Sequence, residues 1–217
     1  MKQLAIGNLN ISFPVIQGGM GVGISLSGLA SAVANQGGIG VISSAGLGLL
    51  YKKLSPDYLK ASILGLKEEL RLAREKSQKG IIGVNVMVAM TNYADIVKTA
   101  IKEKADILFS GAGLPLDLPS FLEKDSKTKL VPIVSSGRAA KLLIEKWKNN
   151  YNYLPDALVV EGPKAGGHLG FKPEQLDDDA FSIEHLIPDV VSVVRPYEAL
   201  YGQRIPIIAG GGIYTGE

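Results

Sequence analysis

The chain of 217 residues is long enough to bury a sizeable core, and 46% of its residues are hydrophobic. Its 23 basic and 21 acidic residues are spread along the chain and leave a formal net charge of +2, so no dense basic stripe indicates a nucleic-acid partner. The sequence contains no cysteine, which excludes disulfides and thiolate metal sites and fits a reducing compartment, so we expect a cytoplasmic protein.

The first part of the chain carries no formal charge from Gln3 to Tyr51, as a membrane segment would. The glycine-rich motifs QGGMGVG and NQGGIG interrupt this stretch, so no uninterrupted apolar window approaches the ~20 residues that a spanning helix needs. It also lacks the basic segment and compact apolar segment that are typical of a signal peptide. We therefore interpret it as buried core and expect no membrane partner.

Short apolar runs rich in β-branched residues alternate with longer segments of helical periodicity. The runs are FPVIQ (13–17), GIGVISS (38–44), IIGVNVMV (81–88), DILFSGAG (106–113), LVPIVSS (130–136), DALVVEG (156–162) and RIPIIAGGG (204–212). The helical segments are 25–36, 56–80, 92–105 and 137–150. This alternation predicts repeated βα units, whose strands form a parallel sheet that is covered on both faces.

Two architectures fit this pattern, a (β/α)8 TIM-type barrel and, as the second candidate, a doubly wound open sheet. Glycine or small polar residues follow nearly every run, which favours the barrel because its strand ends converge on one ligand. Seven strands are predicted before the sequence ends in AGGGIYTGE. We therefore expect one domain over residues 1–217, truncated before the eighth strand so that the C-terminal part of the barrel is missing.

The motif EGPKAGGHLGF (161–171) places His168 behind two glycines at the end of a predicted strand. Histidine ordinarily titrates near pH ~6.5, which suits proton transfer near neutral pH. The glycines are equally consistent with a tight turn, and the histidine with a loop residue. We interpret His185 as an ordinary helical residue, and no ligand at metal-binding spacing accompanies His168, so no metal is expected.

Five motifs, taken together and in order, resemble those of the nitronate monooxygenase family, formerly called 2-nitropropane dioxygenases. They are FPVIQGGM (13–20), GVNVMV (83–88), FSGAGLP (109–115), VVEGPKAGGHLG (159–170) and PIIAGGGI (206–213). The enoyl-acyl-carrier-protein reductase II enzymes share this pattern. The resemblance covers essentially the whole chain, and AGGH after a strand is its most specific part.

The resemblance implies an FMN-dependent (β/α)8 barrel in which His168 is the catalytic, proton-handling group beside the flavin. The residues with an implied cofactor role are Gly19, Met20, Asn85, Glu161, Gly166, Gly167, Gly211 and Gly212. By similarity, the backbone of the first two approaches the flavin ring, the asparagine contacts the isoalloxazine or ribityl region, and the glutamate hydrogen-bonds a ribityl hydroxyl. The next two glycines pass close to the flavin, and the last two hold its phosphate.

The sequence departs from the family pattern in two places. It lacks the GTRF-like strand that follows AGGGI and completes the phosphate site, so either the sequence is a fragment of a longer protein or the chain is shortened and binds flavin poorly. The run ending in VPIVSS also carries no lysine, which some nitronate monooxygenases place near this position. We therefore expect weaker electrostatic support for a reduced flavin anion.

Three functions remain in competition. The first is oxidation of a nitronate or nitroalkane by FMN and dioxygen, with His168 as general base or as the group that orients the nitronate. The second is an NAD(P)H-dependent enoyl-thioester reductase, which the acidic segment 173–182 disfavours because it is an awkward neighbour for an anionic carrier protein. The third is a non-catalytic, truncated flavin-binding fragment. Whether the protein forms a homo-oligomer is open.

Overall fold

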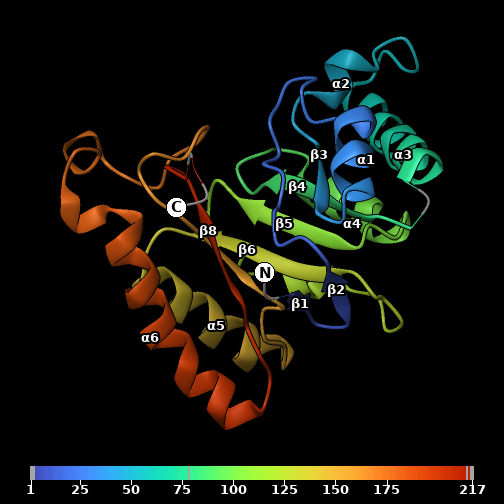
Figure 1. Cartoon of the computed structure of the whole chain (residues 1–217). Helices are drawn as coiled ribbons and strands as arrows, with labels where there is room; N and C mark the ends of the chain where they lie inside the picture. The colour runs from blue at the N-terminus through green and yellow to red at the C-terminus, as the bar shows by residue number, and fades with distance from the viewer. Residues whose placement is uncertain (1–2, 78, 214, 216–217) are drawn as a thin grey trace.

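The main feature of the computed structural model, which describes residues 3–77, 79–213 and 215, is a parallel sheet with the order β3–β4–β5–β6–β7–β8 (Figure 1). Its strands are β3 (Ile39–Ser43), β4 (Ile81–Met87), β5 (Ile107–Gly111), β6 (Lys129–Val134), β7 (Leu158–Glu161) and β8 (Ile207–Gly210). Each strand pairs with the next one in the sequence. This sequential order is that of a barrel and excludes the doubly wound alternative, in which the order reverses at a switch point.

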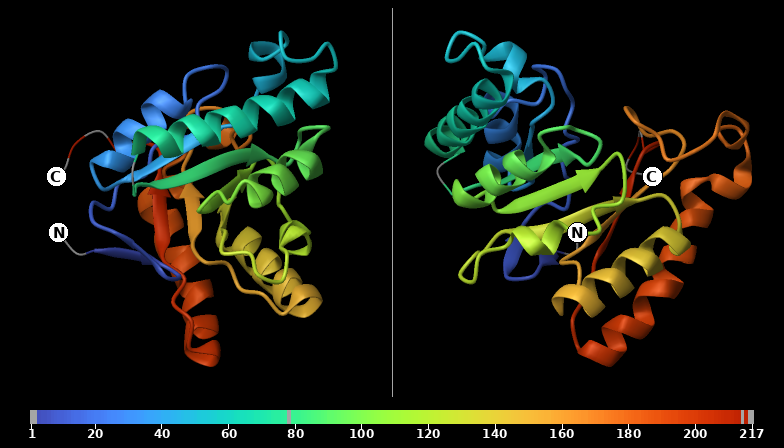
Figure 2. Two further views of the ribbon diagram at one scale, coloured as in Figure 1. Left: turned by 90° about the vertical axis from the view of Figure 1, so that its right-hand side faces the viewer. Right: turned by 180° about the vertical axis from the view of Figure 1, so that it is seen from behind.

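The helices lie on the outer face of the sheet, α1, α3 and α4 beside β3–β5, and α5 and α6 beside β6–β8 (Figures 1 and 2). They are α1 (Ser27–Asn35), α2 (Leu47–Leu50), α3 (Tyr58–Ser77), α4 (Tyr93–Lys102), α5 (Gly137–Tyr151) and α6 (Ile183–Tyr201), with the 3-10 turns η1 (Leu118–Phe121), η2 (Pro173–Gln175) and η3 (Asp179–Phe181). The four helices predicted from periodicity correspond to α1, α3, α4 and α5. In the described part of the chain, none of these helices is long and apolar enough to cross a bilayer.

Both faces of the sheet are apolar, as the lack of polar alternation predicts. Side chains on the outer face, such as Val84 and Leu108, pack against the helices, and those on the inner face, such as Val41 and Phe109, form a separate core cluster. Successive residues of one strand point to opposite faces. This explains why β3 and β5 are buried at every position.

A short antiparallel hairpin, β1 (Leu4–Ile6) and β2 (Leu9–Ile11), covers part of the inner face. Its two-residue turn begins with Gly7, whose φ of 56° lies in the left-handed region that glycine adopts readily. Gly7 lies against Lys129 and Asp156, near the amino-terminal ends of β6 and β7. The hairpin therefore closes the inner face at the end opposite the carboxyl ends of the strands. The hairpin was not predicted from the sequence.

The first predicted strand, 13–17, is not a full strand of the sheet, so the expected count of seven is wrong for the described residues. It forms one isolated parallel bridge, between Ile16 and Ile39. Beyond that bridge the side chain of Gln17 replaces the backbone, because its amide nitrogen donates to the Val41 carbonyl at 2.9 Å and its oxygen accepts from the Val41 N–H at 3.3 Å. The backbone is thus free to turn away into the loop that carries Gly19 and Met20.

Candidate functional site

The residues singled out in the sequence lie at the carboxyl ends of the strands, the end where barrel enzymes keep their chemistry. Asn85 is within β4 and pairs in register with Ser43, near the end of β3. Glu161 is the last residue of β7 and pairs with Gly210, the last residue of β8. The remaining predicted residues occupy three loops, 18–26, 162–172 and the segment after β8.

Gly19 and Asn85 are in direct contact although they are distant in the sequence. The Asn85 side-chain amide donates to the Gly19 carbonyl at 3.2 Å, and a Cβ atom at Gly19 would overlap the asparagine side chain. Only glycine therefore fits here. The contact fixes the predicted flavin-ring loop against β4.

Ser25 organises the same loop and was not singled out by the sequence analysis. Its buried hydroxyl donates to the Gly18 carbonyl and accepts from the Met20 N–H, both at 2.9 Å. The Met20 N–H is therefore already hydrogen-bonded within the protein, while the Met20 side chain is 49% exposed. A serine within a glycine-rich loop was the available signal, because serine hydroxyls commonly bind nearby backbone groups.

Glu161 is half-buried at the end of β7, and burial raises the pKa of its carboxyl group. No side-chain hydrogen bond joins it to any other residue that the structure describes. The loop that follows is tied to the neighbouring strand, because the Gly162 N–H donates to the Gly210 carbonyl at 3.0 Å. Even partial burial of a carboxyl group without a protein partner is costly, so this one is suited to accept a hydrogen bond from a ligand hydroxyl.

The glycines after β8 lie against the loop after β7. Gly211 and Gly212 have φ angles of 92° and 78°, and a Cβ at Gly211 would overlap the Ala165 backbone. A Cβ at Gly212 would lie 3.2 Å from Cδ of Lys164, which brings a cation to the predicted phosphate site. Among the described residues, the N–H groups of these two glycines have no acceptor. Backbone N–H groups beside a lysine can bind a phosphate. Lys164 was not singled out from the sequence.

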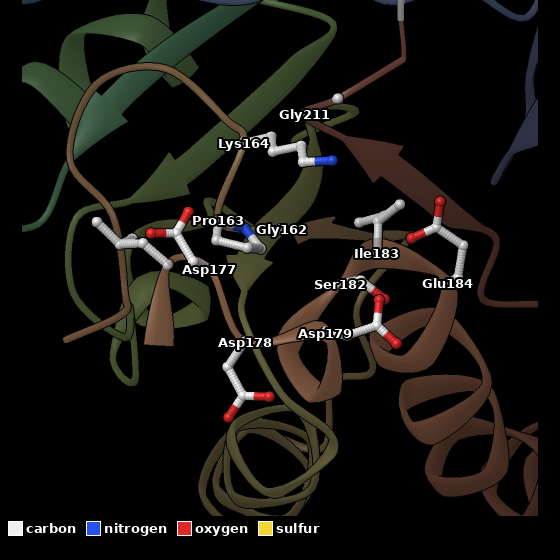
Figure 3. Close-up of a pocket in the computed structure, with 12 residues that line it drawn as sticks. Gly162, Pro163, Lys164, Asp177, Asp178, Asp179, Ser182, Ile183, Glu184 and Gly211 are labelled. Carbon is white, nitrogen blue, oxygen red and sulfur yellow. The ribbon is translucent and has the colours of Figure 1, made fainter. Parts of the chain in front are cut away.

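A cavity of about 280 Å³ adjoins these glycines (Figure 3). It lies between the loop after β7, the acidic insertion and the start of α6, and four carboxylates line it, those of Asp177, Asp178, Asp179 and Glu184. Figure 3 shows Lys164 on the Gly211 side of the cavity and Asp178 on the opposite side. An anionic group would therefore be favoured at the lysine end and repelled elsewhere.

His168 lies in the open part of the loop after β7 and is exposed. A Cβ at the preceding Gly167 would contact no atom within 4 Å, and one at Gly166 would only touch Met20 Cε, at 4.0 Å. The AGGH turn thus lies beside the Gly19–Met20 loop, and His168 makes no side-chain hydrogen bond or ion pair with another residue in the described ranges. Its catalytic role stays a prediction.

His185 is a helical residue, as expected, near the start of α6. Its Nδ1 lies 2.9 Å from both the Ser182 hydroxyl and the Asp179 carbonyl, so it fastens the acidic insertion to the helix. In the part of the chain that the structure describes, no group of three histidine, cysteine or acidic side chains is arranged to hold a metal ion.

Comparisons with known proteins bear on this site. A family model described as nitronate monooxygenase matches residues 2–217. A "(3aS,4S,5R,7aS)-5-hydroxy-7a-methyl-1-oxo-octahydro-1H-indene-4-carboxyl-CoA dehydrogenase" of Mycobacterium tuberculosis is 28% identical over 209 residues, covering 96% of this chain and 48% of that protein. A probable nitronate monooxygenase of Staphylococcus aureus is 25% identical over 231 residues, covering 96% of this chain and 60% of that protein.

Two solved structures have a similar fold. FabK from Thermotoga maritima has a TM-score of 0.69 at 28% identity, covering 95% of this chain and 53% of that one. Nitroalkane oxidase from Streptomyces ansochromogenes has a TM-score of 0.70 at 20% identity, covering 94% of this chain and 59% of that one. The chain thus spans about half to three fifths of the length of these relatives.

Proposed function

Because the chain belongs to the nitronate monooxygenase family, we propose that it is an FMN-dependent oxidoreductase that oxidises nitronates or nitroalkanes with dioxygen. The observation that carries the proposal is the meeting, at the carboxyl ends of the strands, of open glycine backbone with a half-buried carboxyl group that has no described partner. We propose further that residues 1–217 belong to one flavin-binding domain of the (β/α)8 type, and that the protein is cytoplasmic.

The donor set fits FMN. The N–H groups of Gly211 and Gly212, with Lys164 beside them, suit a phosphate, and Glu161 suits a ribityl hydroxyl. The Gly19–Asn85 contact holds the backbone of loop 18–26 close to β4, where we propose that it approaches the flavin ring. When bound, FMN supplies the electron-transfer chemistry, and the protein supplies orientation and proton handling.

His168 is the residue proposed to handle the proton. As a general base it takes the proton from the acidic carbon of a neutral nitroalkane, and toward a preformed nitronate it donates a hydrogen bond that orients the anion. The open turn made by Gly166 and Gly167 leaves room for a substrate beside the imidazole. Lys164 is proposed to add positive charge near the phosphate.

The direct test is an absorption spectrum of the purified protein followed by an oxygen-consumption assay with a nitronate. Flavin bands together with nitronate-dependent oxygen uptake are the expected result. A protein that binds no flavin when FMN is supplied would contradict the proposal and favour a non-catalytic role.

A second candidate is an NAD(P)H-dependent enoyl-thioester reductase, and one observation favours it. The chain is 28% identical to FabK, an enoyl-acyl-carrier-protein reductase II, and only 20% identical to nitroalkane oxidase. The acidic wall of Asp177, Asp178 and Asp179 argues against it, because an anionic carrier would meet repulsion there. NAD(P)H consumption that depends on a crotonyl thioester, without nitronate-dependent oxygen uptake, would select the reductase.

A further inference from the structure

Glu69 is a buried acidic residue of α3 that the proposed chemistry does not use, and both of its carboxylate oxygens accept hydrogen bonds. The Ser27 N–H donates to Oε2 at 2.6 Å, and the Tyr51 hydroxyl donates to Oε1, also at 2.6 Å. Only 3% of the glutamate is exposed. Burying a carboxylate costs free energy unless hydrogen-bond donors satisfy its oxygens. The two hydrogen bonds therefore offset the cost of burying Glu69.

The two donors come from two segments that lie near the carboxyl end of β3. Ser27 is the first residue of α1 and directly follows loop 18–26, which carries Gly19 and Met20. Tyr51 directly follows α2 in the insertion after β3. The positive end of the α1 dipole also favours a negative charge beside Ser27.

Loop 18–26 and the α2 insertion pack against each other. A Cβ at Gly46 would lie 2.6 Å from Cγ1 of Val22, and one at Gly21 would lie 2.9 Å from the Ala45 Cβ. A Cβ at Gly23 would lie 3.5 Å from Leu50. The loop therefore packs directly against the insertion, and we expect a displacement of one segment to displace the other.

The Tyr51 ring packs against α3 at Gly65. A Cβ at Gly65 would lie 2.6 Å from Cδ2 of the ring, so the absence of a side chain there makes room for it. Gly65 and Glu69 are one helical turn apart and face the same way, so the ring on Gly65 directs its hydroxyl to Glu69. Burial, and then the Glu69 carboxylate, raise the pKa of Tyr51 well above its usual range, which keeps the hydroxyl a donor.

We propose that Glu69 is a positioning residue for the candidate flavin site, which joins the start of α1 to Tyr51 and thereby holds loop 18–26 and the α2 insertion in one arrangement. The proposal rests on the proposed function for what the loop binds. The geometry of the loop does not depend on that function, and it can be measured without any flavin.

The test is hydrogen exchange of the flavin-free protein, followed by titration with FMN. Glu69→Met removes both acceptors at similar side-chain length, and we expect amide exchange in 18–27 and 46–54 to rise about 10-fold, with exchange in β5 and β6 unchanged. FMN affinity should fall about 10-fold in the same variant. Glu69→Gln should behave like wild type, because its carbonyl can accept from Ser27 while its amide donates to the Tyr51 oxygen.

Two further variants complete the design. Glu68→Met is the matched control, because Glu68 is on the same helix, has a side chain that is 37% exposed and pairs with Arg71, so the change should alter neither exchange nor FMN affinity. Tyr51→Phe removes only the hydroxyl, and it should raise exchange in 46–54 more than in 18–27. This variant carries the test if Glu69→Met does not fold.

The proposal is overturned if Glu69→Met exchanges like Glu68→Met, if exchange rises uniformly over the whole sheet, or if Tyr51→Phe matches wild type in both segments. The exchange results do not involve flavin. Faster local exchange in a protein that binds no FMN would therefore support the positioning role and contradict the proposed function, whereas normal exchange in a flavin-binding protein would do the reverse.

Discussion

At the scale of single residues, His168 differs from the rest of the candidate site because it is exposed and makes no side-chain hydrogen bond or ion pair within the described ranges. We predict that His168→Ala retains FMN but loses about 100-fold in turnover of a neutral nitroalkane, the usual scale of a lost general base. A preformed nitronate has already lost its proton, so its turnover should fall less. Steady-state oxygen consumption with both substrates measures the difference.

His185→Gln is the control for this prediction. It changes the other histidine of the chain, which contacts Ser182 and Asp179 and not the glycine loops. It should leave both turnover numbers unchanged. Equal losses for nitroalkane and nitronate in His168→Ala would contradict the general-base role and leave only orientation of the substrate.

Glu161 has a burial-raised pKa and no described partner, which is a cost to the folded protein at neutral pH. Since its folded pKa lies above its unfolded one, its ionisation lowers the stability as pH rises through that folded pKa. We predict that Glu161→Gln is more stable to urea than wild type at pH 7, that this gain disappears below the unfolded pKa near pH 4.5, and that FMN binds the variant more weakly. A variant with no gain in stability and unchanged FMN affinity would contradict a ligand-binding role.

At the scale of elements, the β1–β2 hairpin contributes two fully buried isoleucines to the inner core. Ile11→Ala should destabilise the protein by about 2–5 kcal/mol, because it leaves a cavity between the hairpin and the sheet. Asn10→Ala, its exposed neighbour on β2, should change stability by less than about 0.5 kcal/mol. Urea unfolding measures both. Similar values for the two variants would mean that the hairpin does not stabilise the sheet.

The strands and helices of the sheet show where prediction from sequence works. Six of the seven predicted strands and all four predicted helices are present, because each carries its own local pattern of hydrophobicity and punctuation. The hairpin was missed because strands of three residues are too short to show a period. Segment 13–17 was overestimated because nothing local reveals that the Gln17 side chain, rather than the backbone, pairs with Val41.

At the scale of the whole molecule, the candidate site joins loop 18–26 near the start of the chain to the segment after β8 near its end. A ligand that bridges them should stabilise the fold, and FMN at 100 times its Kd adds about 2.7 kcal/mol. We predict a rise of about 5–10 °C in the melting temperature with FMN. Riboflavin at the same concentration should give a smaller rise, because it lacks the phosphate. Equal shifts for the two ligands would contradict phosphate binding by Gly211 and Gly212.

The sequence by itself determined the layers of this protein and the positions of its motifs. Apolar strands without polar alternation require both faces of the sheet to be covered, and glycines after the strands mark the ends where a ligand can approach. Family membership, which the motifs indicated, is confirmed by the match over residues 2–217.

Only the tertiary structure decided which of those residues meet. The contact of Gly19 with Asn85, the place of Lys164 beside Gly212 and the two hydrogen bonds to Glu69 each join segments whose neighbourhood depends on strand register and loop path. Local propensity carries no information about such pairs. The physical reason is that a hydrophobic pattern specifies which face of an element is buried, whereas a specific polar contact requires two backbones to be brought within hydrogen-bond distance.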